Sequence, residues 1–293
     1  MTVVIAGCGD LGTKVGLRFA AVGHRVVGLR RSAHKLPSEI DGQSIDLSVE
    51  VPTLPADTAI VMIAMSPDAR SVDGYRTAYV DSVRNIATAI KRDCASPPRV
   101  VYVSSTAVYG VVDGSWVDES SAAEPTAATA VVLRDAEELL WAKLSDATVV
   151  RLAGIYGPGR TRQIDRLRDG VETISAETRF TNLIHRNDAA AAIVHLATMD
   201  ATPASVYIGV DDCPTDQREI TEFLADSLNL PMPPSEPGAD GDVGGGSASL
   251  DSGPTFGKRC RNTRLRQSGF VFEFPSYREG YAAVLAGDGT RHP

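Results

Sequence analysis

The chain has 293 residues, 43% of them hydrophobic, which is enough to bury one large α/β domain with a smaller appendage. Its formal net charge of −8 disfavours nucleic-acid binding, which needs a cationic surface. No apolar run is long enough to span a membrane, strand character from residue 2 leaves no room for a signal peptide, and four widely spaced cysteines fit reduced thiols, so we expect a cytoplasmic protein with no membrane partner.

Apolar, β-branched runs alternate with helix-like stretches over the first half of the chain. Strands are predicted at Thr2–Ala6, Arg25–Leu29, Ala59–Ala64, Arg99–Ser104 and Ala147–Leu152, with a weaker one near Ser44–Asp46. Helices are predicted at Leu11–Val22, Tyr75–Arg92, Ala130–Leu144 and Asp188–Met199, the last with Asp188 as its N-cap. This alternation is typical of a Rossmann-type α/β fold, in which helices cover both faces of a doubly wound parallel sheet.

The pattern changes after about residue 153. Two further helices are predicted at Thr215–Leu228 and Tyr277–Leu285. Between them, Pro231–Pro254 is rich in Pro, Gly, Ser and Asp, which predicts a mobile loop. We therefore expect a Rossmann-type domain over residues 1–155 and a smaller lobe, interleaved with it, over residues 156–293.

A glycine motif, Gly-Cys-Gly-Asp-Leu-Gly at residues 7–12, follows the first strand and begins the first helix. In a dinucleotide-binding turn, Gly7 would form the tight bend, Gly9 would let backbone N–H groups approach a pyrophosphate, and Gly12 would let the helix pack on the strand. Asp10 and Leu11 would line the same site, at the positive end of the helix. An ordinary glycine-rich turn is the alternative.

The end of the second strand predicts which nicotinamide cofactor binds. NAD-binding folds usually place an acidic residue there, but no acidic residue occurs between Asp10 and Glu39. The strand instead runs into Arg30, Arg31 and Ser32, which suit a 2′-phosphate. The sequence therefore predicts NADP, a solvated basic pair being the alternative. Three further residues are predicted to border the cofactor: Asp46 near the adenine, Ala64 and Ser104.

Residues 103–110, Val-Ser-Ser-Thr-Ala-Val-Tyr-Gly, together with the glycine motif and the arginine pair, resemble the short-chain dehydrogenases/reductases. The resemblance is to the extended and atypical group, the NAD(P)-dependent epimerase/dehydratases, and continues at residues 151–160, 182–188, 258–260 and 274–280. It implies the same fold, a nicotinamide cofactor and a homodimer through the helices at Tyr75–Arg92 and Ala130–Leu144.

The same resemblance implies a catalytic serine, tyrosine and lysine. Ser105 matches the serine that orients the substrate oxygen. The Tyr-x-x-x-Lys pair would fall at residues 129 and 133, which are Thr129 and Leu133, so the usual proton donor and its pKa modulator are absent. Tyr109 and Tyr156 are candidate substitutes, although each could simply pack in the core.

Two charged side chains near these segments have open roles. Arg134 could supply the lost lysine charge, or it could be an ordinary surface arginine. His185 could shuttle protons near neutral pH, although a structural histidine is the commoner reading. No His, Cys, Asp or Glu spacing suggests a metal site.

Two functions follow from these observations. The first is an NADP-dependent oxidoreductase or epimerase that acts on a small hydroxyl- or carbonyl-bearing substrate, such as a sugar derivative. The second is a non-catalytic NADP-binding sensor or scaffold, because the Tyr-x-x-x-Lys pair is missing. The fold cannot decide between them.

Overall fold

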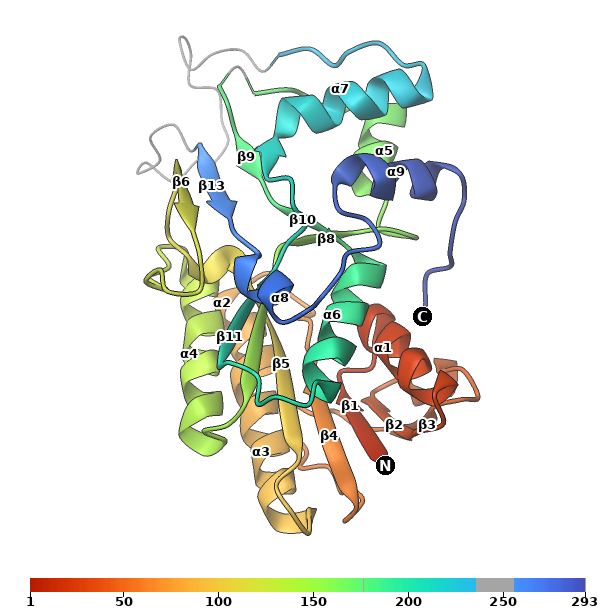
Figure 1. Ribbon diagram of the computed structural model, residues 1–293, viewed down its shortest axis with the longest axis vertical. Helices are drawn as coiled ribbons and strands as arrows, with labels where there is room; N and C mark the ends of the chain where they lie inside the picture. Colours follow the sequence, from red (N-terminus) through yellow and green to blue (C-terminus); the bar gives the residue numbers. More distant parts are fainter. Residues whose placement is uncertain (176, 236–255, 293) are drawn as a thin grey trace.

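A computed structural model describes residues 1–175, 177–235 and 256–292 of the chain (Figure 1). Residues 236–254 of the predicted mobile loop lie outside the described residues. The centre of the molecule is a seven-stranded sheet in which all neighbouring strands are parallel, in the order β11-β7-β5-β4-β1-β2-β3. The strands are β1 (Thr2–Ala6), β2 (Arg25–Arg30), β3 (Asp41–Ser44), β4 (Thr58–Ile63), β5 (Arg99–Ser105), β7 (Thr148–Leu152) and β11 (Val206–Gly209). The strand order reverses between β1 and β4, which is where ligands bind in such sheets.

Helices cover both faces of the sheet. On one face lie α1 (Asp10–Ala21) and α6 (Arg186–Thr198). On the other lie α3 (Ser82–Asp93) and α4 (Ala128–Lys143). In β4, Ile60 and Met62 pack with α1 and α6, whereas Val61 and Ile63 pack with α3 and α4. Burial on both faces explains why the strand is apolar without interruption.

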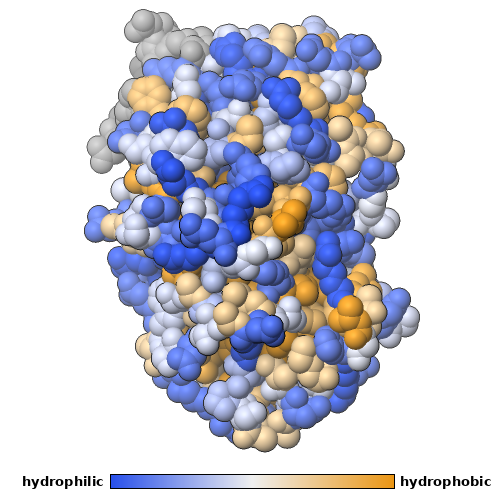
Figure 2. All heavy atoms as spheres, in the orientation of Figure 1, coloured by the Kyte–Doolittle hydropathy of each residue, from blue (hydrophilic) through white to orange (hydrophobic). Residues whose placement is uncertain are grey.

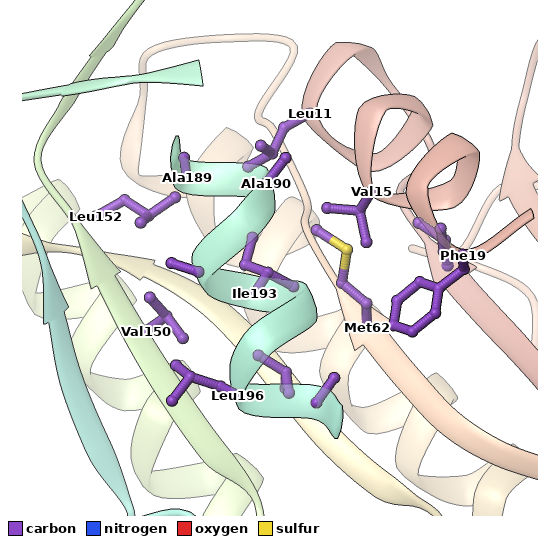
Figure 3. Close-up of a cluster of buried hydrophobic side chains, with 14 of the residues drawn as sticks. Leu11, Val15, Phe19, Met62, Val150, Leu152, Ala189, Ala190, Ile193 and Leu196 are labelled. Carbon is purple, nitrogen blue, oxygen red and sulfur yellow. The ribbon is translucent and has the colours of Figure 1, made fainter. Parts of the chain in front are cut away.

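Figure 3 shows the core between α1, α6 and the sheet. Val15 and Phe19 of α1 point toward Met62 of β4, and Ile193 of α6 lies in the same cluster. Each such side chain contributes roughly 1.5–3 kcal/mol when fully buried. The alanines of α6 let it pack closely on the sheet.

The helix predicted at Tyr75–Arg92 forms with a change of pitch. It begins as α2 (Val72–Tyr75), continues as a π-helical turn, η2 (Arg76–Asp81), and ends as α3. The third strand lies slightly earlier than predicted, at Asp41–Ser44, where every residue is exposed at the sheet edge and no apolar pattern marks it.

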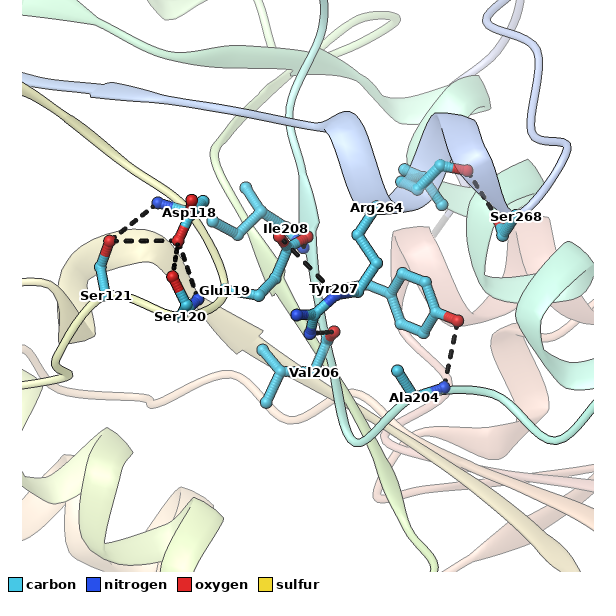
Figure 4. Close-up of polar contacts among 11 residues, drawn as sticks. Asp118, Glu119, Ser120, Ser121, Ala204, Val206, Tyr207, Ile208, Arg264 and Ser268 are labelled. Atoms are coloured by element: carbon cyan, nitrogen blue, oxygen red, sulfur yellow. Dashed lines mark hydrogen bonds and ion pairs between the residues drawn. The ribbon is translucent and has the colours of Figure 1, made fainter.

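The last strand of the sheet, β11, was not predicted from the sequence. It joins the sheet beside β7 although it follows residue 155. Helix α6 also follows residue 155 and packs against the sheet. The division of domains at residue 155 therefore stays a proposal. Side chains satisfy the open edge of β11 (Figure 4): Ile208 N donates to Glu119 at 3.0 Å, and Arg264 donates to Val206 O at 2.9 Å. Such pairing protects an edge strand.

The remaining elements gather at the end of the sheet where β7 leads into β8 (Figure 1). Two small sheets form there, from β8 (Gly154–Tyr156) with β10 (Leu183–His185), and from β12 (Thr215–Asp216), β9 (Phe180–Thr181), β13 (Gly257–Cys260) and β6 (Asp113–Val117). The helices are α5 (Arg162–Arg168), α7 (Gln217–Leu228), α8 (Thr263–Gln267) and α9 (Tyr277–Leu285), and two short 3-10 turns, η1 (Ala33–Lys35) and η3 (Thr106–Val108), lie elsewhere.

Polar and apolar side chains are interspersed on the face of the molecule shown in Figure 2. Within the described ranges, the helices are too short or too polar to cross a membrane.

Candidate functional site

The glycine motif forms a tight turn between β1 and α1. Gly7 and Cys8 both donate their N–H groups to Leu29 O at 3.0 Å. Gly7 has a φ of +80°, and a Cβ there would lie 2.4 Å from Ala64 O. A Cβ at Gly12 would lie 3.0 Å from Gly7 O. Glycine is therefore required at Gly7, where a side chain would both strain and overlap the backbone, and Gly12 leaves little room for one.

Gly9 serves a different purpose. A Cβ on it would meet no atom within 4 Å, because it faces open space. It is the N-cap of α1 and has no side chain to cap the helix. The first N–H groups of α1 have no partner within the helix and carry its positive dipole end, so this geometry fits a pyrophosphate.

Two cavities meet at this turn and form one cleft across the sheet. The larger, about 510 Å³, extends toward β2 and β3, and the smaller, about 240 Å³, extends toward β5 and β7. Every predicted cofactor-binding residue lines one or both of them: Gly7, Gly9, Asp10, Leu11, Gly12, Arg30, Arg31, Ser32, Asp46, Ala64 and Ser104. Their role in binding stays a prediction, but the structure brings them together.

At the arginine end of the cleft, Arg31 has a partner, Asp68, that was not predicted from the sequence. Arg31 donates two hydrogen bonds to the Asp68 carboxylate, at 2.6 and 2.7 Å, and both side chains are largely exposed. Arg30 donates to Cys8 O at 3.2 Å. Asp46 accepts hydrogen bonds from the backbone and hydroxyl of Ser48. The prediction considered only acidic residues at the end of β2, and Asp68 follows β4 instead.

Two glycine variants separate the folding role of the turn from its binding role. We expect Gly7→Ala to lower the free energy of unfolding by about 1–3 kcal/mol or more, because a left-handed φ is strained for alanine. Gly9→Ala should leave that free energy within about 1 kcal/mol and weaken dinucleotide binding at least about tenfold, because its methyl group enters the cleft. Urea denaturation and calorimetry measure the two effects. Equal binding losses without any loss of stability would contradict this division.

The smaller cavity contains the predicted serine and a tyrosine. Ser105 lines it, and its hydroxyl accepts a hydrogen bond from Ala107 N at 3.2 Å. Within the described ranges, the buried Ser104 hydroxyl has no hydrogen-bond partner. Leu133 of α4 and Tyr79 of η2 also line the cavity. Ser104 therefore offers an unused polar group to a ligand in this cavity.

Tyr109 and Tyr156, the predicted substitute proton donors, lie elsewhere. Tyr109 is buried, lines neither cavity of the cleft, and has the Arg151 guanidinium 4.8 Å from its ring centre. Burial raises its pKa to about 12. Tyr156 lies outside the cleft and lines the arginine-rich cavity described below; its hydroxyl donates to Ser276 O at 3.3 Å. Arg134, for which the sequence left open a charge-supplying role or that of a surface arginine, forms ion pairs with neighbours on its own helix.

The Arg151 guanidinium that lies over the Tyr109 ring belongs to a buried ion pair. Arg151 of β7 donates to both carboxylate oxygens of Glu137 on α4, at 3.1 and 2.6 Å. Their side chains are 6% and 0% exposed. This pair could not be predicted from the sequence, because its partners lie on a strand and a helix and are 14 residues apart.

Asp10 joins the turn to the C-terminal elements. Its carboxylate accepts hydrogen bonds from Arg160 and Arg186, both at 2.8 Å, and from His292 N at 3.1 Å. Burial favours the neutral acid, but these hydrogen bonds and the Arg186 charge outweigh it and hold the pKa of Asp10 below its usual value. The negative charge that Asp10 adds beside α1 is thus compensated.

The prediction that Asp188 caps α6 was wrong. The helix begins two residues earlier, and His185 is its N-cap, with Nδ1 accepting from Asn187 N at 3.3 Å. Asp188 lies inside the first turn and accepts from the backbone of Glu273 and Phe274. Burial lowers the pKa of His185 to about 4, so its imidazole is neutral near pH 7. His185 lines neither cavity of the cleft.

A third cavity, of about 450 Å³, adjoins the serine end of the cleft and shares Ile155 and Arg160 with it. Four arginines and one carboxylate, Glu172, are the charged side chains among its lining residues: Arg160, Arg162, Arg166 and Arg179. Arg166 is paired with Glu172 at 2.5 Å. The cavity is therefore positively charged. In the described part of the chain, no group of three or more His, Cys, Asp or Glu side chains is placed to hold a metal ion.

Comparisons with known proteins agree with this architecture. A family model, the NAD dependent epimerase/dehydratase family, matches residues 3–209. Protein YeeZ of Escherichia coli K12 is 27% identical over 207 residues, 66% of this chain and 72% of YeeZ. A candidate NAD-dependent epimerase/dehydratase from Methylobacillus flagellatus is 30% identical, with a TM-score of 0.75 over 98% of both chains.

A more distant structure shares the fold. The UDP-glucuronic acid 4-epimerase of Bacillus cereus, in complex with NAD, has a TM-score of 0.76 at 14% identity over 96% of both chains. The family model covers more than two thirds of this chain. The chain therefore belongs to the NAD dependent epimerase/dehydratase family.

Proposed function

We propose that the protein is an NADP-dependent oxidoreductase or epimerase of the short-chain dehydrogenase/reductase type. The cleft that runs from Arg30 and Arg31, past Gly9, to Ser104 and Ser105 carries this proposal. Guanidinium groups at the ribose end suit a 2′-phosphate, which NAD lacks. When bound, a reduced nicotinamide would supply a hydride at the serine end. Ser105 would orient the substrate oxygen by hydrogen bonding.

The substrate we propose is a small, anionic, sugar-derived molecule with a carbonyl or hydroxyl group. The arginine-lined cavity beside Ser105 supports it, because arginine binds phosphate and carboxylate groups bidentately. The Bacillus cereus enzyme of the same fold is named for a nucleotide sugar, which agrees with this class. Hydride exchange with NADPH over a panel of aldehydes, ketones, sugar phosphates and sugar nucleotides tests the proposal. Turnover limited to uncharged substrates would remove the anionic requirement.

A non-catalytic NADP-binding sensor is the second candidate. It is favoured by Leu133, which lines the cavity at the position where relatives carry the lysine. A leucine cannot hold the nicotinamide ribose or lower the pKa of a tyrosine. Tight NADPH binding without turnover of any member of the panel would favour the sensor.

The Arg31–Asp68 pair predicts how the cofactor preference can be tuned. A 2′-phosphate must compete with Asp68 for Arg31, and exposed ion pairs are worth about 0–1 kcal/mol. We expect Asp68→Asn to tighten NADPH binding by up to about fivefold and to leave NADH binding unchanged. Calorimetry with both cofactors measures this. Equal changes for the two would show that Arg31 does not meet the 2′-phosphate.

A further inference from the structure

The π-helical turn η2 breaks a helix that is otherwise α-helical from Val72 to Asp93. Such turns insert one residue into the hydrogen-bond ladder, re-aim the side chains beside it, and occur frequently at functional sites. Tyr79 lies on this turn and lines the same cavity as Ser104 and Ser105. Among the described residues that line this cavity, it is the one tyrosine.

Tyr79 also faces the helix from which relatives present their tyrosine. It packs against the cluster that contains Leu133 of α4, and η2 and α4 are in extensive contact. In this chain, Thr129 and Leu133 occupy the tyrosine and lysine positions, so α4 contributes no phenol. Tyr109 and Tyr156 do not line the cavity.

We propose that Tyr79 is the proton donor of the site, presented from η2 in place of the missing tyrosine on α4. The inference rests on the proposed function. A carbonyl substrate beside Ser105 would gain a hydride at carbon from the reduced nicotinamide, which is oxidised, and the Tyr79 hydroxyl proton at oxygen. The products are an alcohol and a Tyr79 phenolate, which regains a proton from water.

The surroundings of Tyr79 determine the direction of its pH dependence. Burial, and then the neighbouring Tyr75, raise the pKa of Tyr79 to about 12, and Tyr102 of β5 also faces it. Tyr79 is therefore protonated between about pH 6 and 9, where it can donate but hardly accept a proton. Carbonyl reduction should be nearly independent of pH over this range, and alcohol oxidation should become faster as pH rises.

The first test compares two tyrosines on the same helix. Tyr79→Phe should lower kcat for NADPH-dependent carbonyl reduction at least about 100-fold and leave the Kd for NADPH within about twofold. Tyr75→Phe is the control, because the Tyr75 ring lies 5.4 Å from that of Tyr79 but lines neither cavity of the cleft. If Tyr79→Phe turned over the substrate with the kcat of the wild type, the inference would be overturned and the proposed function would remain. No turnover by the wild type would overturn the proposed function, and the role of Tyr79 with it.

A second test does not depend on turnover. In protein labelled with ¹³C at the tyrosine hydroxyl carbon, the Tyr79 signal is assigned by its absence in Tyr79→Phe. NADP⁺ should shift this signal, whereas 2′-phospho-ADP-ribose, which lacks the nicotinamide, should shift it far less. Equal shifts with the two ligands, or no shift with either, would show that Tyr79 does not face the nicotinamide and would overturn the inference.

Discussion

Replacing Arg30 and Arg31 together by alanine is expected to weaken NADPH binding about 100-fold and NADH binding less than about fivefold. Hydrogen bonds to a charged group contribute roughly 1.5–3 kcal/mol each, and breaking the Arg31–Asp68 pair offsets up to about 1 kcal/mol of that gain. A net loss of about 3 kcal/mol corresponds to roughly a hundredfold in Kd. NADH lacks the 2′-phosphate, so it loses none of these bonds. Calorimetry with both cofactors measures the ratio.

Lys35→Ala is the matched control for the double variant. Lys35 is an exposed cation on η1 that follows Ser32 by three residues in the sequence. It does not line the cleft. Its loss changes the general charge of the region but removes no group from the cavity. We expect both Kd values to change less than about twofold. If Lys35→Ala weakened NADPH binding as much as the double variant, the effect would be long-range charge rather than a 2′-phosphate site.

Glu137→Ala is expected to lower the free energy of unfolding by about 3–5 kcal/mol, because it leaves the Arg151 charge buried without a partner. Arg151 is part of β7, its side chain packs against α4, and the residue is 5% exposed, so water cannot replace the carboxylate without a rearrangement. The cost arises mainly from the desolvated charge. Urea denaturation followed by circular dichroism measures it.

Glu138→Ala provides the comparison on the same helix. The Glu138 side chain is 61% exposed and pairs with Arg134 at 3.4 Å. Exposed ion pairs of this kind contribute about 1 kcal/mol or less. Similar losses for the two variants would show that burial does not determine the value of the Glu137–Arg151 pair.

Much of the sheet could be predicted because its central strands are buried on both faces. The strand predicted at Thr2–Ala6 is an unbroken buried run, and β1 has the same first and last residues. The edges were harder: β3 is Asp-Gly-Gln-Ser with no apolar pattern, and β11 has four residues and relies on Glu119 and Arg264, distant in sequence, to complete its edge.

The site divides in the same way. The glycine motif and the arginine pair act through local backbone and charge, so the sequence indicated them. Asp68 and Tyr79 reach the cleft from other strands and helices, and only the fold brings them there. The sequence predicted one continuous helix at Tyr75–Arg92 and not the π-helical turn that carries Tyr79, so Tyr79 was not singled out. The homodimer implied by the resemblance stays a prediction.

The glycine turn and the two arginines are proposed to bind NADP. Titration of the unaltered chain with NADPH and NADP⁺ by calorimetry tests this most directly, with NADH in parallel. We predict one NADPH bound per chain, with a lower Kd than that of NADH. If neither NADPH nor NADP⁺ bound, the cleft would not be an NADP site. If NADH bound more tightly than NADPH, the two arginines would not bind the 2′-phosphate.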